Sequence, residues 1–425
     1  MSVSVVVWDD RHGLTDRLER LRGTVTVVRR CDELTEVVAL AETGLAHAAL
    51  LAGDTAVIDA ASLDALHRLG VPALVLTDDL DERRRLSSLG AGLESTSAGA
   101  QSIADLLELL CGAPPAPGGP RDRPGGDLAA GPAESTAPGR IVAVWGSGGS
   151  PGRTTLAVNL AVEAALAGQR VLVLDCDTYA ASVAVHLGLL DESAGVAQLC
   201  RLADQGVLDR PGFERACPEV AVAGARMRVA TGLPRASRWP ELRSASLARV
   251  LAYARRRADL VVVDIAPYVE RDEDLSFDTA APQRNAATLA VLEDADEVLA
   301  VGQGDSVGVP RLVKALEELR EILPDAAARV VFNKVRASSV GHAPERQLRE
   351  TWERFGPSGA VAGFLPWDGE AADRALLAGS ALAESAPASA LRTAVAGLAG
   401  TGVPRRRRLL GRRPPANVTF PPAGG

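Results

Sequence analysis

A glycine-rich segment near the middle of the sequence has the residue types that hold phosphate groups. It reads Trp-Gly-Ser-Gly-Gly-Ser-Pro-Gly-Arg-Thr-Thr over residues 145–155, between a strand-like stretch at 141–144 and a helical pattern at 156–167. A turn of this composition directs backbone N–H groups at one point, and the helix N-terminus adds positive charge there. A threonine hydroxyl at the start of the helix is a ligand suited to Mg²⁺. We therefore predict a phosphate-binding loop here.

Aspartates follow two further hydrophobic stretches. Asp175 and Asp177 end the stretch that begins at Val171, and Asp264 ends the stretch that begins at Leu260. Because parallel strands end at one edge of a sheet, we expect these carboxylates to face the crevice where ligands bind. There they can hold Mg²⁺ through water and orient an attacking water. The three elements together favour a nucleotide site.

The loop departs from the common pattern Gly-x4-Gly-Lys-Ser/Thr at two positions. Ser147 stands at the first glycine position and Arg153 at the lysine position. Only Lys314 and Lys334 are lysines among the 46 basic residues. Arginine keeps the charge and binds phosphate bidentately, but it is larger and planar, so the exchange is not conservative. We expect nucleotide binding to survive more readily than turnover, since losing a group that stabilises the transition state slows a reaction by roughly 10²–10³.

The region after residue 139 resembles the MinD/ParA group of P-loop ATPases, which have a deviant Walker A motif. Further matches lie at Ala295–Val298, Val330–Val335 and Phe364–Asp368. The resemblance implies a P-loop NTPase domain with a mostly parallel sheet, ATP and Mg²⁺ as ligands, and a homodimer. The group's additional lysine reaches the partner's phosphates from early in the loop, where this chain has Ser147 and Gly148.

The resemblance also assigns roles to matching residues. The residues expected to contact the nucleotide are Gly148, Gly149, Ser150, Pro151, Gly152, Arg153, Thr154, Thr155, Asn333 and Pro366, the last two at the adenine. The expected metal ligands, partly through water, are Thr154, Asp175 and Asp264. Asp177 would position the hydrolytic water and Arg153 would support catalysis, although whether ATP is hydrolysed stays open.

The first 111 residues alternate strand-like and helix-like stretches, which predicts a parallel sheet with helices on both faces. The expected strands are Val3–Trp8, Thr24–Val28, Ala48–Leu51 and Ala73–Leu76. The expected helices are Leu14–Leu21, Glu33–Ala41, Ala61–Leu69, Glu82–Leu89 and Gln101–Leu110. This pattern resembles a flavodoxin-like receiver domain.

The receiver resemblance is incomplete at the residues that carry phosphotransfer. Asp9, Asp10 and Thr77 match the pattern. The phospho-acceptor position at the end of the third strand is apolar, and Asp54 lies two or three residues after that position. The lysine expected after the fifth strand is absent from Leu93–Ser97. We interpret this domain as a degenerate receiver used for contacts.

Composition sets the domain limits and excludes several classes of function. We expect a receiver-like domain at 1–111, a Pro/Gly/Ala-rich linker at 112–139, an ATPase domain at 140–401 and an Arg/Pro-rich tail at 402–425, with linker and tail disordered. A net charge of −8 and 3% aromatic residues argue against nucleic-acid binding as the main activity. Five unpatterned cysteines and no signal-like or spanning segment predict a cytoplasmic protein with reduced thiols. Peripheral contact with the inner face of the membrane stays open.

Three functions remain open. A degenerate receiver before such an ATPase is the arrangement of CpaE/TadZ-like proteins, which implies localisation or assembly of pilus, secretion or septum machinery through protein partners. The second alternative is a non-catalytic scaffold that keeps only the nucleotide fold. The third is a ParA-like chromosome or plasmid partitioning ATPase.

Overall fold

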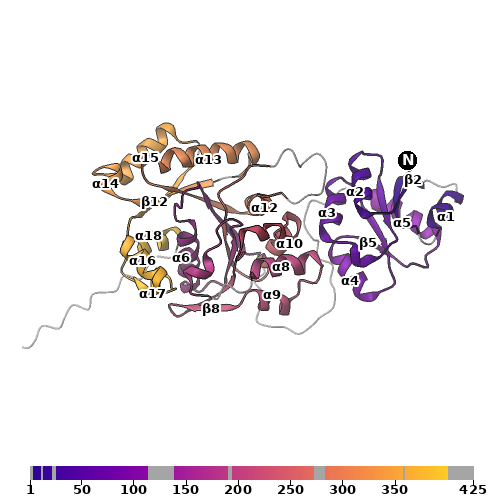
Figure 1. Ribbon diagram of the computed structural model, residues 1–425, viewed down its shortest axis with the longest axis horizontal. Coiled ribbons are helices and arrows are strands. Elements are labelled where there is room, and N and C mark those ends of the chain that lie inside the picture. Colours follow the sequence, from indigo (N-terminus) through magenta and orange to yellow (C-terminus); the bar gives the residue numbers. More distant parts are fainter. Residues whose placement is uncertain are drawn as a thin grey trace, which may run out of the picture.

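The computed structural model describes residues 3–10, 13–21, 25–112, 138–189, 194–271, 283–326, 328–357 and 359–400. The expectation of disorder for the linker and the tail falls outside these ranges, apart from residues 112, 138 and 139. The described residues form two separate β-sheets, each with its own helices, which lie side by side (Figure 1). No helix in these ranges is both long and apolar enough to cross a membrane.

The N-terminal sheet has five parallel strands in the order β2-β1-β3-β4-β5. They are β1 (Val3–Trp8), β2 (Val25–Cys31), β3 (Ala48–Leu51), β4 (Ala73–Leu76) and β5 (Gly92–Glu94). The central strands are continuous apolar runs because both faces of the sheet are covered. This strand order is the flavodoxin-like one that the alternating pattern predicts.

Helices cover both faces of this sheet. α2 (Leu34–Glu42), α3 (Ala60–Arg68) and α4 (Leu80–Ser88) pack on one face. α1 (Leu14–Arg20) and α5 (Ala100–Gly112) pack on the other. A short 3-10 helix, η1 (Thr55–Val57), follows β3.

The second sheet has eight strands in the order β13-β12-β11-β6-β10-β7-β9-β8, and only the β8–β9 pair is antiparallel. They are β6 (Arg140–Gly146), β7 (Val171–Cys176), β8 (Glu219–Val222), β9 (Ala225–Ala230), β10 (Leu260–Ile265), β11 (Glu297–Gln303), β12 (Ala328–Val335) and β13 (Val361–Pro366). Because β6, β10 and β7 are neighbours, the loop after β6 and the aspartates that end β7 and β10 meet at one edge.

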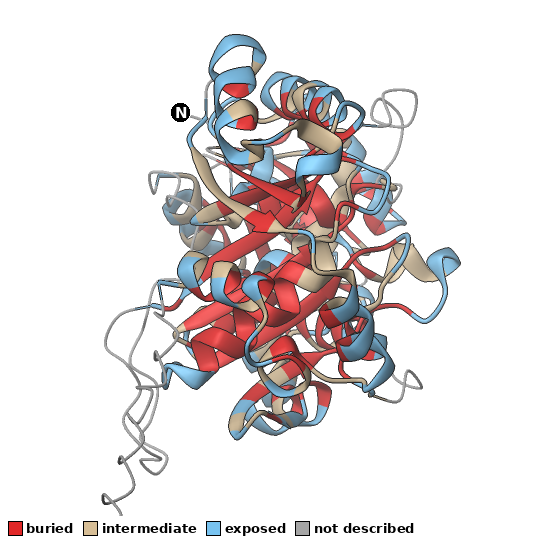
Figure 2. Ribbon diagram, turned by 90° about the vertical axis from the view of Figure 1, so that its left-hand side faces the viewer, coloured by how far each residue is buried: buried red, intermediate tan, exposed pale blue. Residues whose placement is uncertain are grey.

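Two helical layers enclose this sheet, and Figure 2 shows the buried strands between them. One layer contains α6 (Arg153–Leu166), α7 (Val183–His186), α16 (Gly369–Leu377), α17 (Leu382–Ser385) and α18 (Ala390–Leu398). The other contains α8 (Gly195–Asp204), α9 (Arg210–Ala216), α10 (Ser244–Arg255), α12 (Ala286–Asp294), α13 (Gly308–Ile322) and α15 (Pro344–Phe355). The short elements η2 (Ala236–Glu241) and α14 (Ala337–Val340) lie in connections.

Helix α3 of the first domain contacts α10 of the second. Arg249 of α10 pairs with Asp64 of α3, with 2.6 Å between Nη2 and Oδ1. Arg243, just before α10, pairs with Asp59 at 3.0 Å. The two domains are therefore joined by specific polar contacts as well as by the linker.

Candidate functional site

The loop between β6 and α6 depends on residues with positive φ. Gly146 has φ 156°, and a Cβ on it would lie 2.1 Å from the carbonyl oxygen of Val301 in the neighbouring strand β11. Gly149, Ser150 and the N-cap Gly152 have φ of 93°, 54° and 96°. Left-handed residues of this kind curl a chain into the compact loops that bind anions. The backbone at the predicted phosphate loop thus has the form that such a site requires.

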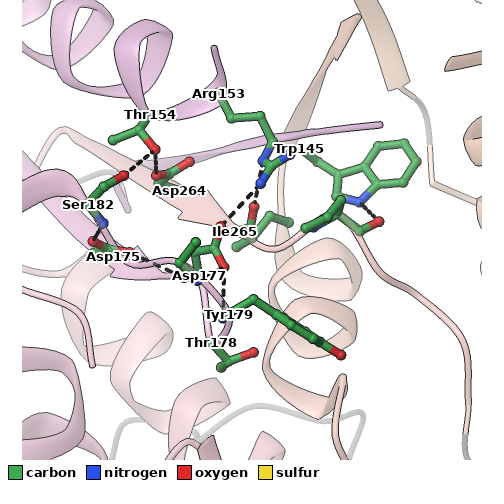
Figure 3. Close-up of polar contacts among 12 residues, drawn as sticks. Trp145, Arg153, Thr154, Asp175, Asp177, Thr178, Tyr179, Ser182, Asp264 and Ile265 are labelled. Atoms are coloured by element: carbon green, nitrogen blue, oxygen red, sulfur yellow. Dashed lines mark hydrogen bonds and ion pairs between the residues drawn. The ribbon is translucent and has the colours of Figure 1, made fainter. Parts of the chain in front are cut away.

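Arg153, the first residue of α6, turns its guanidinium back toward the ends of the strands (Figure 3). Its Nε donates to the carbonyl oxygen of Ile265 at 3.1 Å, and Nη1 donates to that of Ser147 at 3.2 Å. Its Nη2 lies 3.2 Å from Oδ2 of Asp177. All three groups lie at the carboxyl ends of β6, β10 and β7, so Arg153 spans the edge where the loop and the aspartates meet.

Thr154 contacts the aspartate that ends β10. Its Oγ1 donates to Oδ2 of Asp264 at 2.5 Å and accepts from Oγ of Ser182 at 3.0 Å (Figure 3). The other Asp264 oxygen, Oδ1, is buried and has no hydrogen-bond partner among the residues that the structure describes. A buried carboxylate oxygen without a partner is costly unless a cation or a water satisfies it.

Asp175 lies beside Asp264, because these residues pair in register across β7 and β10. Its Oδ2 accepts the backbone N–H groups of Ser182 and Val183, at 3.0 and 2.9 Å. Burial, as the largest cause, raises the pKa of Asp175 to about 7. Burial and the nearby Asp175 carboxylate also raise the pKa of Asp264 well above its usual range. Two crowded carboxyl groups of this kind favour a bound cation.

The oxygen donors at this edge fit Mg²⁺. The hydroxyl of Thr154, the carboxyl of Asp175 and the unpartnered Oδ1 of Asp264 are hard ligands of the kind this ion prefers. No group of three or more His, Cys, Asp or Glu side chains suited to a metal occurs in the described ranges. A Mg²⁺ ion here would therefore need water and phosphate oxygens to complete its shell, as is usual for this ion.

Asp177 is held by the turn that follows β7. Its Oδ1 accepts the backbone N–H groups of Tyr179 and Ala180, both at 2.9 Å. Thr155, the other threonine of the loop, lies with Oγ1 3.5 Å from Nε2 of His186 in α7. The structure thus brings the expected phosphate, metal and water-positioning residues to one place.

Asn333 and Pro366, expected at the adenine, lie at the ends of β12 and β13. The side-chain amide of Asn333 donates to the carbonyl oxygen of Pro151 at 2.8 Å, and its Oδ1 accepts the backbone N–H of Lys334. Pro366 pairs with Val335 at the end of the sheet. Asn333 therefore supports the loop directly, and contact of either residue with adenine remains a prediction.

Several residues at this edge are not predicted from the sequence. Ser182 contacts both Thr154 and Asp175, and Nζ of Lys334 donates to the carbonyl oxygen of Ser150 at 2.9 Å. A serine before a short helical pattern signals an N-cap, but nothing in the sequence indicates a partner 28 residues away. Lys334 has φ 56°, a backbone strain that often marks functional positions, and only the structure shows it.

The space beside the loop is small. A cavity of about 40 Å³ lies between the loop and the start of α13. A cavity of about 470 Å³ lies elsewhere, lined by Arg140, Asp259 and Glu297 among others, near the amino ends of β6, β10 and β11. The larger cavity is not lined by Thr154, Asp175 or Asp264. The candidate site is therefore identified by its phosphate- and metal-binding residues and not by the size of its cavity.

The corresponding edge of the N-terminal sheet uses its aspartates structurally. Asp10 accepts the backbone N–H groups of Leu14 and Thr15 at the start of α1, at 2.5 and 3.2 Å. Asp54 accepts the backbone N–H of Ala56 at the start of η1. Asp10 and Asp54 therefore stabilise the starts of helical elements, and the loss of phosphotransfer in this domain stays a prediction.

Comparisons with known proteins concern the second sheet. Residues 141–377 match the family described as the CobQ/CobB/MinD/ParA nucleotide binding domain. Among solved structures, the chain is similar to a ParA family ATPase from Chlorobium tepidum, with 15% identity, a TM-score of 0.50, and coverage of 61% of this chain and 98% of that one. It is also similar to the cell division ATPase MinD of Pyrococcus furiosus, with 18% identity, a TM-score of 0.48, and coverage of 62% and 97%. At such identities the likeness concerns the fold alone. No curated protein sequence matches the chain.

Proposed function

Because the chain belongs to the CobQ/CobB/MinD/ParA family of nucleotide-binding domains, we propose that it binds ATP with Mg²⁺ at the loop edge of its second sheet. The observation that carries this proposal is the cluster that Thr154, at the start of α6, forms with Asp264 and Asp175, at the ends of β10 and β7. The N-terminus of a helix after a curled loop favours phosphate. The adjoining unpartnered carboxylate oxygen favours the cation that accompanies it.

Different residues would bind the phosphates, the metal ion and the adenine. The backbone of 148–152 and the guanidinium of Arg153 would bind phosphate oxygens, and Thr154 with Asp264 and Asp175 would hold Mg²⁺. The bound ion would offset the charge of the phosphates. Thr155 would approach the α-phosphate, while Asn333 would keep the loop in place through Pro151 and lie toward the adenine with Pro366.

Turnover would be weak. Asp177 is the candidate to position a hydrolytic water, but its carboxylate is paired with Arg153. Arg153 must leave that pair to reach the phosphates, so a buried ion pair has to break before Asp177 is free to position a water. A slow ATPase that serves as a switch fits this arrangement better than a rapid enzyme does.

Nucleotide binding tests this proposal directly. Wild type should bind ATP and ADP at millimolar concentration or below by calorimetric titration, whereas Asp264→Ala and Thr154→Ala should not. Asp259→Ala, at the opposite end of β10, is a matched control that should bind normally. Failure of wild type to bind either nucleotide would exclude the proposal. Turnover that disappears in Asp177→Ala would exclude the purely non-catalytic scaffold.

The cellular role that we propose is localisation or assembly of pilus, secretion or septum machinery, by a cytoplasmic homodimer that contacts the membrane at most peripherally. The receiver-like domain, joined to α10 through Arg249 and Arg243, would serve as the contact surface for protein partners. A ParA-like partitioning role is equally consistent with the family. Retention of the ATP-bound protein on non-specific DNA, falling steeply with salt, would favour partitioning instead.

A further inference from the structure

A second guanidinium reaches the phosphate loop from a different element. Arg311 lies in the first turn of α13, which follows β11, the strand next to β6. A Cβ on Gly149 would lie 2.6 Å from Nη1 of Arg311 and 3.7 Å from its Cζ. The guanidinium therefore rests against the loop, and glycine at 149 is the residue that allows this approach.

Arg311 differs in its partners from the other cations at the loop. Arg153 is paired with Asp177, and Lys334 donates to the carbonyl oxygen of Ser150. The side chain of Arg311 is exposed, and in the described ranges its guanidinium has no hydrogen bond or ion pair. Arg311 and the backbone of 147–149 line the same small cavity. An unpaired guanidinium beside an anion-binding loop is suited to a charge-assisted, bidentate bond with phosphate.

Starting from the proposed nucleotide site, we propose that Arg311 contacts the terminal phosphate of a bound nucleoside triphosphate. The proposed role of Thr155 places the α-phosphate at the α6 end of the loop. The earlier residues 147–149 then lie toward the far end of the phosphate chain, where Arg311 is. The loop itself contains no lysine, so α13 supplies the additional positive charge. Arg311 would make the site prefer a triphosphate over a diphosphate.

The test compares a non-hydrolysable ATP analogue with ADP. Arg311→Ala should weaken binding of the analogue roughly tenfold, as expected for loss of one charge-assisted bond, and change ADP binding less than about twofold. Arg311→Lys keeps the charge but loses the planar, bidentate guanidinium. Its affinity for the analogue should lie between those of wild type and Arg311→Ala. Lys314→Ala removes the same charge from an exposed position one turn along α13 and should bind both nucleotides like wild type.

The outcomes separate this inference from the proposed function. Three results for Arg311→Ala would overturn the role of Arg311 and leave the nucleotide site intact. The affinities for the analogue and for ADP could fall equally, both could stay unchanged, or binding could become tighter. The same selective loss in Lys314→Ala would also overturn it, because the effect would then come from general charge. A wild type that binds neither nucleotide would overturn both. Unchanged thermal unfolding of each variant verifies that the fold is retained.

Discussion

The guanidinium of Arg153 and the carboxylate of Asp177 form an ion pair at 3.2 Å, with side chains only 12% and 4% exposed. The residue expected to bind phosphate is therefore held by the residue expected to position water. Ion pairs that are this buried are costly to break by removing one partner. A triphosphate can replace Asp177 as the partner of Arg153, which links nucleotide binding to release of the aspartate.

Asp177→Asn should raise ATP affinity and abolish turnover. The asparagine oxygen can still accept the N–H groups of Tyr179 and Ala180, but it no longer competes with phosphate for Arg153. We expect an increase in affinity on the order of tenfold, or about 1.4 kcal/mol. Calorimetric titration and phosphate release measure the two effects, with Asp259→Asn as a control. Unchanged affinity would show that Arg153 does not leave Asp177 when nucleotide binds.

Gly152→Ala should destabilise the protein more than a comparable glycine substitution. Its φ is 96°, and a Cβ would lie 2.4 Å from Nδ2 of Asn333, which supports the loop through Pro151. The strained backbone alone costs about 1–3 kcal/mol. Gly168→Ala is the matched control, since φ is 91° there but, in the described part of the chain, no atom beyond the adjacent residues lies within 4 Å of the added Cβ. Urea unfolding of both variants isolates the effect of the Asn333 contact, and equal losses would mean that the contact adds nothing.

The main strands could be predicted from the sequence because they are buried on both faces. β1, β3 and β4 begin and end at the predicted residues, since each is a short apolar run between polar turns. The sequence does not predict the β8–β9 hairpin. Its two turn residues, Ala223 and Gly224, both have positive φ, and alanine rarely marks such a turn.

The site could be predicted as a set of residues but not as a set of contacts. The phosphate loop and the aspartates follow parallel strands, and parallel strands end at the same edge of a sheet. That these residues lie close together is therefore predictable once the strands are neighbours. The pairing of Arg153 with Asp177 and the approach of Arg311 depend on side-chain directions across different elements. No spacing along the chain encodes these directions, so only the folded structure shows them.

Stability should fall as pH rises from about 4 to about 7. The pKa of Asp175 is raised from 3.8 to about 7, chiefly by burial, and that of Asp264 is raised in the same direction. In this window the folded protein keeps protons that the unfolded chain has lost, so each step upward in pH favours unfolding. Urea unfolding at several pH values measures the slope.

Two variants test the origin of this pH dependence. Asp175→Asn should reduce the slope because an amide does not titrate. Asp259→Asn should leave the slope unchanged. The hydrogen bond from Arg170 lowers the pKa of Asp259, so this group titrates below the pH range in which Asp175 does. Saturating ATP with Mg²⁺ should also flatten the slope, since a bound cation favours both charged carboxylates. A slope unchanged in Asp175→Asn would contradict the assignment.

Arg249→Ala should loosen the contact between the two domains. Nη2 of Arg249 lies 2.6 Å from Oδ1 of Asp64, and its Nε is buried. Burial raises the pKa of Asp64 even though Arg249 acts to lower it, so the carboxyl gives up solvation to make this contact. We expect single and double alanine substitutions of the pair to show a coupling of about 1 kcal/mol in a double-mutant cycle. We also expect unfolding of Arg249→Ala to separate into two transitions.

Arg256→Ala, just after α10, keeps the interface pair and is the control. A single cooperative transition in Arg249→Ala, with additive effects in the cycle, would mean that apolar packing of α3 on α10 joins the domains without this pair.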